Sequence, residues 1–221
     1  MKKIRIFSSI VLFLLGALSV KSQTSRTAGD SCKTLLTAIK ENEPKKVVQL
    51  LETTNPNCSC ELKNGPRTPL VLAGRIGNFD IVRELIDAGA DVTFHVDRDE
   101  TPLMAAVLHD NVALAQYLIK KGAKINKELS GDGTALLIAS REGNLKVVSY
   151  LIENGAKVNA LVIGDGTALI QATKNGHSKV VELLLKNGAD PKLEAQGDEN
   201  PMYHALASNN KTIISLLKKY Q

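Results

Sequence analysis

The chain has 221 residues, of which 43% are hydrophobic and 4% aromatic, and it contains no tryptophan. Its formal net charge is +5 at pH 7, but part of this excess lies in the first 22 positions, which contain no acidic residue. The basic residues of that segment are Lys2, Lys3, Arg5 and Lys21. Without them the chain would be nearly neutral. This balance argues against nucleic acid as a partner, because nucleic-acid binding needs a basic surface.

Residues 1–22 have the pattern of a signal peptide. Basic residues precede an apolar run over 6–20, which is short for a membrane span, and small residues follow it. Cleavage is expected after Ser22, with a cut after Ser19 as the alternative, and residues 23–31 would then form a polar leader. The pattern predicts export to a periplasm or an extracellular space, without stable membrane insertion after cleavage. An uncleaved anchor is the competing interpretation.

All three cysteines, Cys32, Cys58 and Cys60, lie in the first sixty residues. An exported chain meets oxidising conditions, so a disulfide is expected. Cys32 begins one predicted helix, and the other two cysteines follow the next helix, which runs back antiparallel, so these ends should be neighbours. We predict that Cys32 is bonded to Cys58 or Cys60, with one thiol left over. No metal site is predicted, because a fourth ligand and a Cys-x-x-Cys pair are both missing.

Short phrases of the type Thr-Pro-Leu recur at a fixed interval of 33 residues. They begin at Thr68, Thr101, Thr134, Thr167 and Asn200. A period held without insertion over five copies predicts a repeat array, in which each unit packs on its neighbours. The predicted array spans 32–221, with units over 32–65 (N-terminal cap), 66–98, 99–131, 132–164, 165–197 and 198–221 (C-terminal cap).

Each full unit is predicted to contain two helices and a finger. The first Thr can cap a short helix with its hydroxyl group, while a proline such as Pro69 fills the first helical position. A residue that tolerates a left-handed backbone should end this helix. These residues are Gly77, Asp110, Gly143, Gly176 and Asn209. The second helix has an apolar stripe, as over 81–86, and the roughly ten residues after it contain turn residues typical of a β-hairpin.

The pattern Thr-Pro-Leu-x-x-Ala, Gly-Asn, Val-x-x-Leu-Ile and Gly-Ala-Asp-Val resembles the ankyrin repeat. The resemblance implies an all-α solenoid of about six helix-turn-helix layers with β-hairpin fingers. One departure is systematic, because the family usually has His after Thr-Pro-Leu. This chain has Val71, Met104, Leu137, Ile170 and Tyr203 there. Apolar packing should therefore replace the hydrogen bond that this His makes between neighbouring loops.

No catalytic residue, cofactor or metal is predicted. None of the four histidines has Ser or Cys in a nucleophile setting, Gly-x-Ser-x-Gly is absent, and His177 falls where the ankyrin family often carries a structural His. The two Gly-Asp-Gly-Thr stretches lack the third glycine of a phosphate-binding loop and are interpreted as turns. Each turn aspartate is expected to accept N–H bonds within its own turn. These aspartates are Asp99, Asp132, Asp165 and Asp198.

The resemblance implies that partners are recognised by the finger tips and by the exposed ends of the first helices. At the helix ends these residues are Arg75, Ile76, Leu108, His109, Arg141, Glu142, Lys174 and Asn175. At the fingers they are Phe94, His95, Arg98, Leu161, Val162 and Ile163. Apolar residues over 160–163, on a turn expected to face water, suggest a contact that a partner buries. The alternative is that Val162 and Ile163 pack on neighbouring fingers.

The expected function is therefore non-enzymatic binding of another protein on the concave face of a monomer. One version of this hypothesis is an inhibitor, immunity or accessory protein of an exported enzyme. A competing hypothesis is a small-ligand carrier or an enzyme that uses His95, His109 or His204, which a deep pocket joining two of these histidines would favour. A structural component of the cell envelope is a third hypothesis.

Overall fold

The computed structural model describes residues 29–63, 65–97, 99–129, 131, 133–195 and 199–220. The expected signal peptide lies outside the described residues, as does most of the polar leader. Residues 29–31, at the end of that leader, already belong to a helix over 29–40. None of the helices in these described ranges is both long and apolar enough to cross a membrane.

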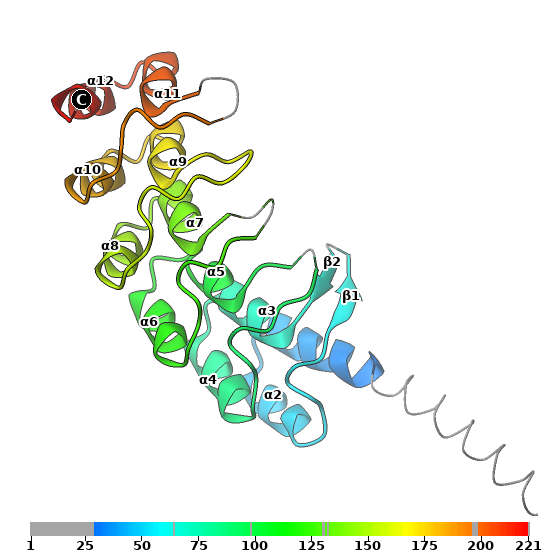
Figure 1. Ribbon diagram of the computed structural model, residues 1–221. Helices are drawn as coiled ribbons and strands as arrows, with labels where there is room; N and C mark the ends of the chain where they lie inside the picture. Colours follow the sequence, from blue (N-terminus) through cyan, green and yellow to red (C-terminus); the bar gives the residue numbers. More distant parts are fainter. Residues whose placement is uncertain are drawn as a thin grey trace, which may run out of the picture.

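The described chain is a stack of antiparallel helix pairs (Figure 1). After the helix over 29–40, the elements are α2 (Pro44–Leu51), β1 (Cys60–Leu62), β2 (Gly65–Arg67), α3 (Pro69–Ile76), α4 (Phe79–Asp87), α5 (Pro102–Ala106), α6 (Val112–Lys120), α7 (Ala135–Glu142), α8 (Leu145–Glu153), α9 (Ala168–Lys174), α10 (Ser178–Lys186), α11 (Pro201–Ala207) and α12 (Lys211–Lys219). The first helices, α3 to α11, form one row and the second helices, α4 to α12, form another, with the loops projecting from the stack (Figure 1). The predicted all-α solenoid is confirmed.

One apolar core runs through the whole stack. The stripe of each second helix faces inward, and in α8 the side chains of Val147, Val148 and Leu151 are fully buried. Each first helix contributes a fully buried alanine at the same place of the repeat, which lets neighbouring helices approach closely. These residues are Ala73, Ala106, Ala139, Ala172 and Ala205. The 33-residue period is therefore the spacing of one packing layer.

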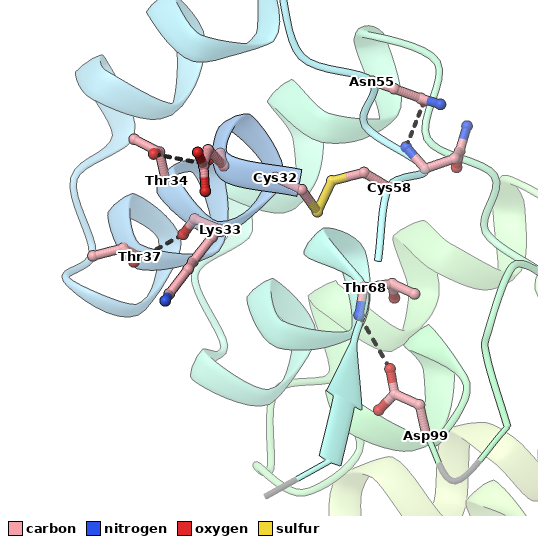
Figure 2. The surroundings of a disulfide bond; sticks show 10 residues. Cys32, Lys33, Thr34, Thr37, Asn55, Cys58, Thr68 and Asp99 are labelled. Atoms are coloured by element: carbon pink, nitrogen blue, oxygen red, sulfur yellow. Dashed lines mark hydrogen bonds between the residues drawn. A yellow bond between two sulfur atoms is a disulfide. The ribbon is translucent and has the colours of Figure 1, made fainter. Parts of the chain in front are cut away.

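The disulfide joins Cys32 to Cys58, across 26 positions of sequence (Figure 2). Cys32 lies in the buried face of the first helix, and Cys58 belongs to a turn closed by its N–H bond to the Asn55 carbonyl oxygen. Cys60 is already part of β1 and keeps a free, partly buried thiol. The turn after α2, which the repeat pattern does not describe, selects Cys58 between the two expected partners.

Side-chain caps begin most of the first helices as expected. Thr101, Thr134 and Thr167 each accept the N–H three residues ahead. Thr68 differs, because its hydroxyl caps nothing and its own N–H donates to Oδ2 of Asp99 at 3.2 Å (Figure 2). The expected cap at Thr68 is therefore wrong, and the contact there joins one unit to the next.

Asp110 does not end the first helix of its unit with a left-handed backbone, as Gly77 does. Helix α5 ends at Ala106, and the only non-glycine residues with positive φ in the described chain are Asn42 and Asn209. The Asp110 carboxylate instead accepts the N–H groups of Lys146 and Val147, at 3.1 and 3.3 Å. It caps the start of α8 in the next unit, a favourable place for a negative charge.

The fingers are shorter hairpins than expected. The strands β1 and β2 pair antiparallel in the first finger. Elsewhere in the described fingers only isolated bridges form, between Leu129 and Gly133 and between Val162 and Gly166. The β1–β2 hairpin lies before the first full unit, where no finger was predicted. The fingers predicted after the second helices form β-hairpins only in this reduced form where they are described.

Gly143 combines a left-handed backbone, with φ of 76°, and a close approach of the next unit. A Cβ atom there would lie 2.5 Å from Nδ1 of His177, whose Nε2 donates to the Arg141 carbonyl oxygen at 2.9 Å. We expect Gly143→Ala to lower the free energy of unfolding by about 1 kcal/mol more than Gly155→Ala. Gly155 also has positive φ, but its Cβ would meet no atom within 4 Å. Urea denaturation compares the two variants, and equal losses would contradict the role given to His177.

Candidate functional site

The finger between α8 and α9 has an apolar tip of two exposed side chains around a buried one. Leu161 is 51% and Ile163 82% exposed, whereas Val162 is 2% exposed. Val162 exchanges two backbone hydrogen bonds of 2.9 Å with Gly166, and successive side chains of an extended segment point to opposite sides. Val162 is thus a buried structural residue, and the interpretation of it as an exposed contact is wrong. Leu161 and Ile163 face solvent.

This apolar tip is particular to one finger of the array. At the position of Ile163, the other fingers have Asn64, Asp97, Ser130 and Gln196, which are all polar. At the position of Leu161, they have Leu62, His95, Glu128 and Glu194. The repeat architecture therefore does not require Ile163. Its exposed apolar side chain, beside that of Leu161, makes this tip a candidate contact surface.

Helix α11 carries a second exposed apolar pair, Tyr203 and Leu206, which are 54% and 60% exposed. One unit earlier, the same positions hold Ile170 and Thr173, both buried. In the earlier units the next unit covers these positions, and α11 belongs to the last described unit. Sequence reasoning missed this pair as a surface, although its alignment with buried positions was a usable signal.

The expected contact residues at the end of α3 are engaged between units. Arg75 donates from Nε to Oε1 of Glu100 at 2.8 Å, and its carbonyl oxygen lies 2.7 Å from Nε2 of His109. Ile76 and Leu108 are half-buried against the core. Arg75 and His109 therefore make their hydrogen bonds inside the protein, and Ile76 and Leu108 pack against its core.

The remaining expected residues are spread along the array. Arg141 forms an ion pair with Glu142, with 3.3 Å from Nε to Oε1, and Asn175 donates from its side chain to the Gln171 carbonyl oxygen. Lys174 is exposed, Phe94 and His95 are half-buried, and Arg98 lies outside the described residues. The structure therefore does not bring the expected contact residues together in one patch. Among them, the exposed apolar side chains of Leu161 and Ile163 are the most distinctive surface feature.

A buried acidic doublet, Asp99 and Glu100, was not anticipated as a cluster. Asp99 has no exposed side-chain surface and accepts Nη1 of Arg67 at 2.9 Å, together with the N–H groups of Thr68 and Glu100. Burial raises the pKa of both acidic side chains, and Arg67 and Arg75 oppose this shift. Asp99 accepts the neighbouring Glu100 N–H as expected of a turn aspartate, and its bonds to Arg67 and Thr68 also tie the first finger to the next unit.

The histidines do not converge on a reactive centre. His109 and His177 bond to carbonyl oxygens of the preceding unit, His95 contacts the Thr93 carbonyl oxygen, and His204 lies 3.2 Å from Glu199. A cavity of about 700 Å³ is lined by His95 but by no second histidine. In the described part of the chain, no three His, Cys, Asp or Glu side chains are grouped to hold a metal ion.

Stacked helix pairs with loops that project from the stack define a helical repeat protein. The family model for ankyrin repeats matches three times, over residues 35–128, 93–162 and 136–221. The chain belongs to the ankyrin-repeat family. A comparison with curated proteins found no match. Ankyrin repeats are in general protein–protein interaction modules and are typically not enzymes.

Proposed function

We propose that this chain is a non-enzymatic module that binds another protein through its finger tips, outside the cytoplasm. The observation that carries the proposal is Ile163, which is 82% exposed at a position that is polar in every other finger. Leu161 lies beside it on the same tip. Burying Ile163 against a partner would contribute up to roughly 1.5–3 kcal/mol, and burying Leu161, which is already half-buried, would contribute about half of that.

Two observations support an exported location in a periplasm or an extracellular space. The Cys32–Cys58 disulfide suits an oxidising compartment, because disulfides are rare in reducing ones. The sequence of residues 1–22 has the order of basic, apolar and small residues found in signal peptides. A monomer that binds an exported enzyme, as an inhibitor, immunity or accessory protein, fits this location.

The test exchanges the apolar tip for the residues of the neighbouring finger. The double variant Leu161→Glu and Ile163→Ser reproduces the tip residues Glu128 and Ser130, which the same architecture already carries. We expect it to lose at least about tenfold in affinity for the partner that the chain without residues 1–22 captures from its own cell envelope. The helical circular-dichroism signal and the thermal midpoint should not change.

Val48→Ser is the matched control for this double variant. Val48 is another exposed apolar side chain, but it lies on α2, far along the array from the tip. The control should capture the partner as the unchanged chain does. If the tip variant captures the partner as well as the control does, the proposal is overturned. If both variants lose the partner to the same extent, the loss is a general effect of surface hydrophobicity and the tip is not the specific contact.

A further inference from the structure

The cavity of about 700 Å³ that His95 lines is bounded mainly by the segments that follow α4 and α6. Its apolar wall includes Val92, Leu103 and Ile125, and the first two of these side chains are buried. A cavity of this size with a largely apolar wall has the dimensions of a small-molecule site. The bonding and the charge of its other lining residues decide which class of ligand it can accept.

The polar side chains of Thr93 and Asn126, which line the cavity, are already bonded within the protein. Oγ1 of Thr93 donates to Oδ1 of Asp91 at 2.8 Å. The Asn126 carboxamide donates to the Gly155 carbonyl oxygen and accepts the Lys157 N–H, both at 2.9 Å. A peptide segment would bring backbone N–H and C=O groups into the cavity, and burying them without partners is costly. A ligand with a hydrocarbon body carries no such groups, so this lining favours it over a peptide.

The charged side chains that line the cavity are both cationic. They are Lys124 and Lys127, and no carboxylate of a described residue lines it. Both lysines are exposed, and neither forms an ion pair with a described residue. A lysine can lay its aliphatic stem along an apolar surface while its ammonium group stays in water. The cavity thus combines an apolar wall with a cationic rim.

This pair of lysines is particular to one unit of the array. At the positions of Lys124 and Lys127, the other full units have Asp91 and Phe94, Lys157 and Ala160, and Asp190 and Leu193. The next finger also has Glu128, a carboxylate, at the place of His95. The same architecture therefore accepts acidic, apolar or small residues at these positions, and the fold does not require the cationic pair.

We propose that this cavity binds a small organic anion with an aliphatic body, of the class of medium-chain carboxylates. The hydrocarbon chain packs on the apolar wall, where its removal from water drives binding. The carboxylate lies at the mouth beside Lys124 and Lys127, whose charges it complements. Leu161 and Ile163 do not line the cavity, so the inference is independent of the proposed protein-binding function.

The first test uses decanoate as the probe, with amide chemical shifts of the full chain as the readout. We expect saturable shifts centred on residues 92–95 and 123–127. Acetate has the charge without the chain, and n-decylammonium has the chain with the opposite charge. Both should bind at least about tenfold more weakly than decanoate. The absence of shifts with decanoate, or equal binding of decanoate and either control ligand, overturns the proposal.

The second test removes the cationic rim. The double variant Lys124→Asp and Lys127→Ala uses residue types that other units already carry at these positions, so the thermal midpoint should not change. It should bind decanoate at least about fivefold more weakly. Lys157→Asp is the matched control, because it makes the same charge reversal one unit later, and it should change the affinity by less than about twofold. If the double variant binds as the unchanged chain does, or if the control loses as much affinity, the proposal fails.

An acidic peptide separates a small ligand from a protein partner at this cavity. Acetyl-Glu-Val-Leu-Val-Glu-amide has apolar side chains and negative charges, but it also brings backbone groups, so it should bind more weakly than decanoate. If it binds there more tightly, the cavity is a protein contact and the inference is wrong. The variant Leu161→Glu and Ile163→Ser should bind decanoate as the unchanged chain does, and a loss in that variant would contradict the assignment to the cavity.

Discussion

Removing the Cys32–Cys58 disulfide is expected to destabilise the N-terminal unit by about 3.5 kcal/mol, the chain-entropy contribution of a loop of this length. The bond joins positions that are 26 residues apart and closes the end of the stack. Because each unit of a repeat array contacts only its neighbours, the effect should be local. Hydrogen exchange of the Cys32→Ser variant should show faster exchange over 29–62 and unchanged protection in α10.

Cys60→Ser is the control for this experiment, because Cys60 is not part of the disulfide. It should retain the protection of the unchanged chain, and a reducing agent should reproduce the effect of Cys32→Ser. If neither reduction nor Cys32→Ser alters exchange over 29–62, the disulfide does not stabilise this unit.

Replacing Arg67 by leucine is expected to lower the free energy of unfolding by about 3–5 kcal/mol at pH 7, because it removes the cation that is paired directly with the buried Asp99 carboxylate. Burial already raises the pKa of Asp99, and losing Arg67 raises it further. A carboxyl group with a raised folded-state pKa stabilises the fold below its unfolded pKa and loses this contribution as the pH rises. The defect should therefore shrink from pH 7 towards about pH 4.

Urea denaturation at the two pH values measures this effect, and two variants separate its causes. Arg83→Leu removes an arginine that pairs with exposed acidic side chains, so its cost should stay below about 1 kcal/mol at both pH values. Adding Asp99→Asn to Arg67→Leu should recover part of the loss at pH 7, because the amide carries no charge. A cost of Arg67→Leu that does not depend on pH would contradict the buried-carboxylate explanation.

The repeat pattern did not determine which side chains are buried at the finger tip over 160–163. The apolar run over 160–163 indicated that something is buried, but it left open whether that burial is inside the protein or in a complex. The bridge between Val162 and Gly166 divides the run, because it turns Val162 inward and leaves Leu161 and Ile163 outside. A pairing register of this kind depends on residues from both sides of the turn, so a linear pattern does not determine it.

Contacts between units were the other part that the sequence left undetermined. Asp110 caps a helix of the next unit, and Asp99 binds Arg67 of the preceding finger. The repeat pattern predicted both residues as local turn or helix-end residues, since it compares positions within a unit and not across a junction.

The sequence by itself determined the ankyrin-type solenoid, its helix pairs and the need for a disulfide at Cys32. Those features follow from a 33-residue period, from apolar stripes and from the number of cysteines, all of which are properties of the chain alone. Only the tertiary structure decided that Cys58 is the partner, that Val162 is core, and that a cavity opens beside Thr93. The first two depend on how a turn folds within one unit or finger, and the third depends on the packing of one layer on the next, so a linear pattern does not determine them.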